Sequence, residues 1–175
     1  EIDWITIAGN GEPTLYPRFS DAVTLLMGLR DEWVPGIPIG ILSNSSTCHR
    51  EDIRDSLSKL DGRFMKLDAG DPKTIESVNK PAGGFDLERT LKALRKLRDI
   101  TVQAMFVQGS YDNTKPKQID QWIKAVQWVT PKAVQVYTID RPPADGKIEA
   151  VSKARLHEIA GLCQARTGIL TDVFD

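Results

Sequence analysis

Five short runs of β-branched and other apolar residues alternate along the chain with amphipathic segments, and this alternation constrains the fold more than any other feature. The runs lie at 4–8, 37–43, 64–69, 101–108 and 133–139, and each is followed by turn residues and then by apolar residues at helical spacing. Strands and helices in alternation are typical of parallel βα units with right-handed crossovers. The sequence therefore predicts a single α/β domain over residues 1–175.

Two architectures accommodate these units: an open doubly wound sheet and an arc of a barrel. The chain has 175 residues, whereas a complete eight-stranded barrel needs roughly 250. In both remaining architectures, ligands bind at the carboxyl ends of the strands. We therefore expect the functional site in the segments that follow the runs, at 9–15, 43–47, 68–71, 108–113 and 139–145.

The composition limits the classes of partner and compartment. The formal net charge is −1, so there is no overall electrostatic reason to bind nucleic acid or an anionic membrane. No run of 18 apolar residues occurs, so no membrane-spanning helix is expected. Cys48 and Cys163 are too few for a disulfide framework and form no Cys-x-x-Cys pair. We therefore expect a cytoplasmic protein in which both cysteines are structural and no residue binds a metal.

The segment Gly-Asn-Gly-Glu-Pro at 9–13 carries the most specific signal. Gly9 and Gly11 would let the backbone approach a ligand closely, although a tight turn after a strand needs glycine as well. A dinucleotide-binding fingerprint fails because Thr14 occupies its third glycine position. Glu12 would repel a phosphate but would suit a cationic group such as an α-ammonium, so the segment favours a zwitterionic ligand.

The segment 9–15, Gly-Asn-Gly-Glu-Pro-Thr-Leu, resembles the Gly-Gly-Glu-Pro motif of the radical S-adenosylmethionine (radical SAM) enzymes. The later strand ends resemble those of the same family in chain order. This resemblance implies an incomplete TIM-like barrel, built from five parallel βα units of a partial (β/α)6 barrel, with S-adenosylmethionine as cofactor. It implies that the first segment holds the amino group of the cofactor and that the later strand ends hold its carboxylate, ribose and adenine. The cofactor-binding residues so implied are Gly9, Asn10, Gly11, Glu12, Ser43, Asn44, Lys66, Asp68, Gln108 and Gly109.

One part of the family pattern does not occur in the sequence. The family binds a [4Fe–4S] cluster through a Cys-x3-Cys-x2-Cys loop, and Cys48 and Cys163 do not have that spacing. We therefore expect the chain to be the C-terminal portion of a radical SAM core and to be inactive by itself. In a full-length protein that contains the cluster, the resemblance implies a 5′-deoxyadenosyl radical that acts on an unidentified substrate. An open-sheet nucleotide-binding domain and a non-catalytic binding module are the alternatives.

Several individual features have two interpretations. Lys66 and Asp68 share a strand face, so an ion pair between them is an alternative to ribose binding by Asp68. Asn44 either caps a turn or contacts the ligand. The segments 79–81 and 141–144 resemble those of a subgroup related to wyosine-forming tRNA-modifying Fe–S oxidoreductases, which makes tRNA a candidate partner. The first run would have an unpaired edge, which favours a dimer through that strand.

Overall fold

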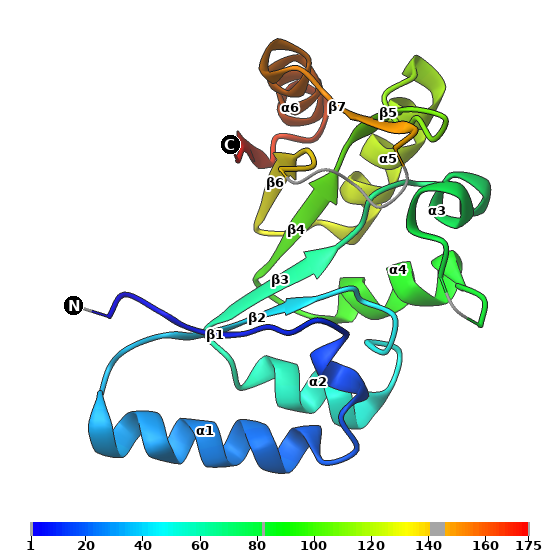
Figure 1. Cartoon of the computed structure of the whole chain (residues 1–175). Coiled ribbons are helices and arrows are strands. Elements are labelled where there is room, and N and C mark those ends of the chain that lie inside the picture. The colour runs from blue at the N-terminus through cyan, green and yellow to red at the C-terminus, as the bar shows by residue number, and fades with distance from the viewer. Residues whose placement is uncertain (1, 82, 141–145, 175) are drawn as a thin grey trace.

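The structure is a computed structural model that describes residues 2–81, 83–140 and 146–174, so the segment 141–144 lies outside the described residues. Its main sheet has six parallel strands in the order β1-β2-β3-β4-β6-β8 (Figure 1). These strands are β1 (Ile5–Ile7), β2 (Ile39–Ser43), β3 (Gly62–Lys66), β4 (Ile100–Met105), β6 (Ala133–Tyr137) and β8 (Leu170–Val173). The five expected strands are confirmed, and β8 is a sixth that the sequence pattern did not indicate.

Helices join the strands in the expected alternation. They are the short 3-10 helix η1 (Pro13–Leu15), α1 (Phe19–Trp33), α2 (Glu51–Ser58), α3 (Pro72–Asn79), α4 (Leu87–Lys96), α5 (Pro116–Val129) and α6 (Lys153–Thr167). Asp71 and Asp86 cap α3 and α4, because their carboxylates accept hydrogen bonds from Thr74 N and Arg89 N at 3.0 and 2.9 Å. Both caps and Pro72 at the start of α3 agree with the helix-start signals in the sequence.

The run 101–108 is not a single strand, which corrects the expectation from the sequence. β4 ends at Met105, and Val107–Gly109 forms a separate strand, β5, that pairs antiparallel with β7 (Ile148–Ala150). At the break, Asn113 Oδ1 accepts the Val107 N–H at 2.8 Å, so this N–H is bound by a side chain. Met105, Phe106 and Val107 are apolar across the break, so hydrophobicity alone did not reveal the change of direction.

The helices cover one face of the main sheet, which distinguishes the two architectures. In β4, Ile100, Val102 and Ala104 are buried while the alternate residues are half-exposed, and β6 repeats this pattern. Figure 1 shows the helices following the outer side of the curved sheet. A doubly wound sheet would have helices on both faces. The arc of a barrel is therefore confirmed, and its inner face carries the half-exposed side chains.

Trp4 covers the inner face near the amino ends of the strands. A Cβ atom at Gly62 would lie 2.9 Å from the Trp4 ring, and one at Gly40 would lie 3.4 Å from it. Phe64 completes the contact, with its ring centroid 6.3 Å from that of Trp4 in an edge-to-face arrangement. These glycines make room for the indole, so this end of the inner face is apolar and the polar groups lie toward the carboxyl ends.

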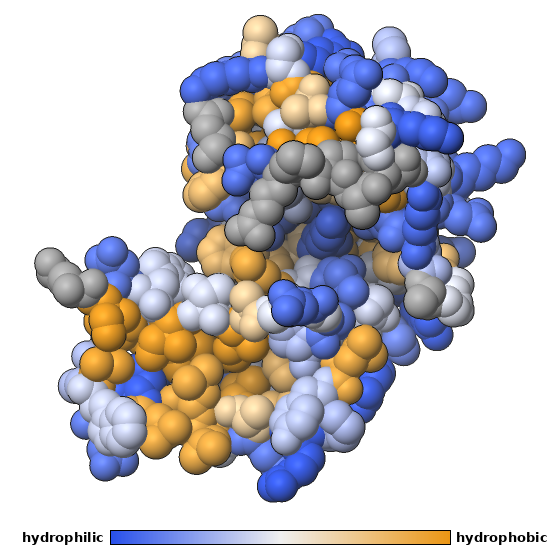
Figure 2. Space-filling view, in the orientation of Figure 1, coloured by the Kyte–Doolittle hydropathy of each residue, from blue (hydrophilic) through white to orange (hydrophobic). Residues whose placement is uncertain are grey.

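The outer edge of β1 has no strand partner among the described residues, since β1 pairs only with β2. Apolar side chains near this edge are exposed, including Trp4 at 47% and, on α1, Leu25 at 65% and Trp33 at 72%. Figure 2 shows apolar surface around β1 and α1. The expected dimer through this strand stays a prediction. No helix within the described residues is long and apolar enough to cross a membrane.

Candidate functional site at the strand ends

Glu12 joins the loop after β1 to the end of β2. Its Oε1 accepts hydrogen bonds from Thr14 N at 3.2 Å and from Ser43 Oγ at 2.8 Å, and the Thr14 hydroxyl also donates to it. Its Oε2 accepts only the Asn44 N–H, at 2.5 Å, among the described residues. An ionised carboxylate has about four acceptor positions. Oε2 therefore keeps an acceptor position for a further donor such as an ammonium.

Gly9 and Gly11 are not required by the packing or by the backbone conformation of the chain. A Cβ atom at Gly11 would meet nothing within 4 Å, and one at Gly9 would meet only Gly11 N at 4.0 Å. Neither residue is among the positive-φ glycines of the described chain. The tight-turn interpretation therefore does not explain these glycines. Both residues and Asn10 between them are exposed, so the segment leaves open space beside its backbone.

Ser43 and Asn44 take the positions expected of them at the end of β2. Ser43 is buried and binds Glu12, while Asn44 Oδ1 accepts the Ser46 N–H at 2.9 Å and caps the turn. Ser45 follows with φ of 68° in the left-handed region, where glycine is usual, and its hydroxyl donates to the Lys66 carbonyl at 2.9 Å. That hydrogen bond compensates for the missing glycine and ties the end of β2 to the end of β3.

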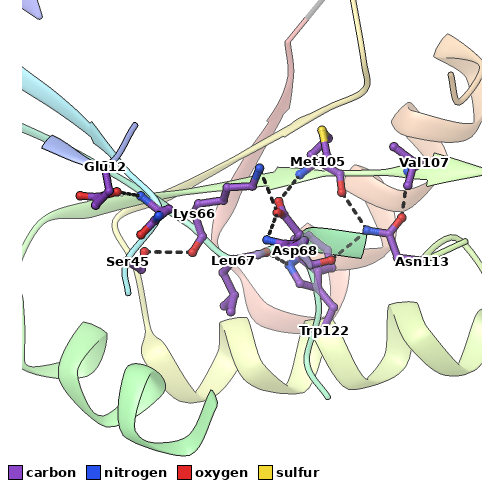
Figure 3. A network of polar contacts seen from close by, with 11 residues as sticks. Glu12, Ser45, Lys66, Leu67, Asp68, Met105, Val107, Asn113 and Trp122 are labelled. Atoms are coloured by element: carbon purple, nitrogen blue, oxygen red, sulfur yellow. Dashed lines mark hydrogen bonds and ion pairs between the residues drawn. The ribbon is translucent and has the colours of Figure 1, made fainter. Parts of the chain in front are cut away.

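Lys66 and Asp68 form an ion pair, as one of the two interpretations anticipated. Lys66 Nζ lies 3.2 Å from Asp68 Oδ2, and Asp68 is completely buried (Figure 3). The Asp68 carboxylate also accepts hydrogen bonds from Met105 N at 2.7 Å and Asn79 Nδ2 at 2.8 Å. It therefore joins β3, β4 and the end of α3.

Burial and charge shift the titration of this pair. Burial raises the pKa of the Asp68 carboxyl, and the Lys66 ammonium and the two hydrogen-bond donors oppose that rise. Burial lowers the pKa of Lys66, but the charge and the hydrogen bond of Asp68, together with the Tyr137 phenol, outweigh it, so the pKa lies above its usual value. Lys66 is therefore a cation at neutral pH. Its side chain keeps 30% of its surface exposed, so it remains available to an anionic group of a ligand.

Asn113 and Trp122 support this site. Asn113 Nδ2 donates to the Asp68 carbonyl at 2.9 Å and to the Met105 carbonyl at 2.8 Å (Figure 3). Trp122 Nε1 donates to the Leu67 carbonyl at 3.0 Å from α5. Both side chains are buried, so the backbone at the ends of β3 and β4 is held in one position. Asn113 lies in the segment 108–113, where the sequence predicts the site, but the sequence did not indicate which backbone groups its side chain would bind.

A cavity of about 320 Å³ opens beside Lys66. Its polar wall contains Asn44, Ser46 and Asn79 as well as Lys66, and its apolar wall is formed by residues of α3 and the segments around it. The apolar lining residues are Ile75, Val78, Pro81, Phe85 and Met105. Such a combination of an apolar wall and a few polar groups is typical of a small-molecule site.

Gln108 and Gly109 lie in the β5–β7 pair, apart from the residues around Glu12. Gln108 Nε2 donates to Thr114 Oγ1 at 3.3 Å, so its amide is engaged within its own loop. Gly109 has φ of 102°, and a Cβ atom there would lie 2.2 Å from the Lys147 carbonyl oxygen. Glycine at this position thus has a structural cause. The structure brings Glu12, Ser43 and Asn44 together, and it brings Lys66 and Asp68 together, but it links Gln108 and Gly109 to neither group by a hydrogen bond.

The two cysteines are placed where they cannot bind a cluster. Cys48 and Cys163 are both buried, and the described residues contain no group of three His, Cys, Asp or Glu side chains that could hold a metal ion. Burial raises the pKa of the Cys48 thiol to about 12 and raises that of Cys163 as well. These residues therefore do not fit a [4Fe–4S] cluster, in agreement with the structural role expected for both.

We predict that neither thiol reacts in the folded protein. At pH 8 the thiolate fraction of Cys48 is on the order of 10⁻⁴, given its pKa of about 12. A colorimetric disulfide reagent should therefore react with no cysteine thiol of the native chain in one hour. In 6 M guanidinium chloride it should react with two thiols per chain. Rapid release from the native chain would show that at least one cysteine is accessible.

The sheet, the helices on its outer face and the polar groups at its strand ends define the barrel fold of the radical SAM enzymes. A radical SAM methyltransferase from Sphaerobacter thermophilus matches with a TM-score of 0.74 and 16% identity, over 98% of this chain and 50% of that one. A domain of pyruvate-formate lyase-activating enzyme from Bacteroides vulgatus matches with a TM-score of 0.71 and 15% identity, over 98% of both chains. The fold expected from the sequence is therefore confirmed.

Sequence comparison gives relatives that are longer than this chain. UPF0026 protein MJ1312 of Methanocaldococcus jannaschii is 30% identical over 173 residues, which are 92% of this chain and 51% of that protein. A protein named GTPase Obg from Brachyspira hyodysenteriae is 27% identical over 176 residues, which are 98% of this chain and 25% of that protein. The chain thus spans a quarter to a half of these relatives. No family model matches the sequence.

Proposed function

We propose that this chain binds S-adenosylmethionine at the carboxyl ends of its strands, as the C-terminal, cofactor-holding portion of a radical SAM enzyme. The observation that carries the proposal is the pair of glycines at 9 and 11, which neither packing nor backbone conformation requires. They lie beside a carboxylate with a free acceptor position. Close backbone approach and a negative charge together suit the α-ammonium of an amino acid ligand.

The neighbouring groups fit the rest of the same molecule. The Lys66 ammonium would pair with the cofactor carboxylate, and Asn44 would contribute its exposed side chain beside it. Ser43 would act through Glu12, because its hydroxyl is already bound to that carboxylate. Asp68 would hold Lys66 in place, and Gln108 and Gly109 would border the adenine. In an enzyme that also contains the cluster, bound S-adenosylmethionine would be the source of a 5′-deoxyadenosyl radical.

The glycines provide a direct test of the proposal. Gly11→Ala should lower the affinity for S-adenosylmethionine by about tenfold or more, because the methyl group fills the space that the ligand needs. The same substitution should keep or slightly raise the melting temperature, since glycine-to-alanine changes at compatible positions stabilise by about 0.4–1 kcal/mol. Titration calorimetry and thermal unfolding of the same samples measure both effects.

Gly161→Ala is a matched control, because it lies on α6 and its Cβ would also meet nothing within 4 Å. It should leave the affinity unchanged. No heat of binding to S-adenosylmethionine by the original chain, or equal affinity for the chain and its Gly11→Ala variant, would refute the proposal.

A nucleoside-triphosphate site is a weaker alternative, suggested by the name of one relative. The sequence contains no Gly-x4-Gly-Lys-Ser/Thr segment, which phosphate-binding loops of that type require. Glu12 also places a carboxylate among the exposed amides where a phosphate would bind.

A further inference from the structure

A second hollow lies on the inner face of the sheet, apart from the strand-end cavity. It has a volume of about 310 Å³ and is lined by residues of β2, β4 and the end of β6, and of the segments that follow β6 and β8. The lining residues are Leu42, Gln103, Tyr137, Thr138, Asp140 and Phe174. None of the residues proposed to hold S-adenosylmethionine lines it, so the two ligands could be bound side by side.

Gln103 lines this hollow and is hydrogen-bonded to a second glutamine, Gln135, on the neighbouring strand. Gln103 and Gln135 are register partners on β4 and β6, and Gln103 Nε2 donates to Gln135 Oε1 at 2.9 Å. Among the described residues, Gln103 Oε1 and Gln135 Nε2 have no hydrogen-bond partner. If the oxygen and nitrogen positions are exchanged in both side-chain amides, the pair still offers one acceptor and one donor. The pair therefore presents a donor and an acceptor side by side, which matches the edge of an amide.

The walls and charges of the hollow select against anions. Leu42 and Phe174 are apolar and 40% and 61% exposed. The Tyr137 phenol is a neutral donor, because burial raises its pKa. Asp140 is the one charged residue among those that line the hollow, and no described lining residue is basic. Lys66 acts on the Tyr137 phenol from outside the hollow, but its charge is already paired with Asp68. A carboxylate or phosphate would therefore lose hydration beside Asp140 and meet no basic residue among the described lining residues.

We propose that this hollow binds a neutral amide edge of the substrate, a carboxamide or a lactam, between Leu42 and Phe174 and against the Gln103–Gln135 pair. The amide N–H donates to Gln103 Oε1, and the amide carbonyl accepts from Gln135 Nε2. Two such hydrogen bonds discriminate strongly against ligands that lack the edge, because the glutamines would then be desolvated without partners. That the bound amide belongs to a substrate rests on the proposed function. That the hollow binds an amide does not.

Small probes test the hollow with the chain as it is. Uracil carries the lactam edge in a ring, N-acetylglycinamide carries it in an open chain, and benzoate is planar but anionic. Heteronuclear NMR titration should give a dissociation constant on the order of millimolar for uracil or for N-acetylglycinamide, given the size of these ligands. Benzoate should bind at least tenfold more weakly. Tighter binding of uracil would indicate a cyclic lactam as the natural ligand, and tighter binding of N-acetylglycinamide would indicate an open-chain carboxamide.

Gln135→Met keeps the length of the side chain and removes its amide. It should weaken the binding of the better amide probe by about tenfold, while Gln127→Met, a matched change on the exposed face of α5, should not. The affinity of Gln135→Met for S-adenosylmethionine should stay within twofold of the original. Benzoate binding as tight as the amides, or an unchanged probe affinity in Gln135→Met, would overturn the assignment. Loss of cofactor binding alone would overturn only the proposed function.

Discussion

Glu12→Gln should weaken the binding of S-adenosylmethionine by about ten- to a hundredfold. The substitution removes a charge-assisted hydrogen bond to the α-ammonium, and such bonds contribute about 1.5–3 kcal/mol. Titration calorimetry measures the loss directly. Asp21→Asn is the matched control, because Asp21 is an exposed carboxylate on α1 that pairs only with Arg18 among the described residues. It should leave the affinity unchanged.

The same substitution also disturbs the loop, because Glu12 accepts hydrogen bonds from Ser43 and Thr14 and from the Asn44 N–H. 5′-Deoxy-5′-methylthioadenosine, which lacks the amino acid part, separates the two effects. Its affinity for Glu12→Gln should equal its affinity for the original chain, since it has no ammonium. An equal loss for both ligands would mean that Glu12 shapes the loop and does not contact the amino group.

Local sequence patterns predicted the elements of the fold well. Runs of five to eight residues rich in β-branched and apolar side chains indicated five of the strands, and Asp71 and Asp86 are N-cap residue types that mark two helix starts. These features depend on neighbours within a few residues, so the sequence contains them directly. The start of α2 was less clear. Ser46 and Thr47 are residue types that often cap helices, but they lie in a turn, and the helix begins at Glu51 after an uncapped Arg50.

β8 could not be recognised from the sequence, for a physical reason. Leu170 and Asp172 face outward while Thr171 is buried, so apolar and polar residues do not alternate in the usual way. The strand is stabilised by pairing with β6 and by its contact with α6, both of which are tertiary features. Edge strands of this kind depend on context more than on composition.

The site was predicted in part. Sequence reasoning could place Glu12 after two glycines, and it could place Lys66 and Asp68 on one strand face. It could not show that Asn44 N–H holds Glu12, because residues 12 and 44 meet only when β1 and β2 are paired. Likewise, the buried state of Asp68 depends on Asn79 and Met105, which are 11 and 37 residues away. Spacing along the chain carries no information about such contacts.

Asn113→Ala should lower the free energy of unfolding by about 3–5 kcal/mol, the largest stability effect that we expect at this site. Asn113 is 1% exposed and satisfies three backbone groups: the carbonyls of Asp68 and Met105 and the N–H of Val107. Each buried group left without a partner costs about 1–3 kcal/mol. Urea denaturation followed by circular dichroism gives the value. Asn79→Ala removes a single hydrogen bond to Asp68 from a more exposed position, so it should cost only about 1 kcal/mol.

Asn113→Asp distinguishes hydrogen bonding from packing at the same position. Aspartate has nearly the same shape and keeps an acceptor for Val107 N–H, but as an anion it cannot donate to the two carbonyls. If the hydrogen bonds stabilise the break between β4 and β5, this variant should be at least as unstable as Asn113→Ala, and the Val107 amide should exchange with deuterium faster. A loss of less than 1 kcal/mol in both variants would show that water can replace the side chain. The ends of β3 and β4 would then be held by Asp68 and Trp122 and not by Asn113.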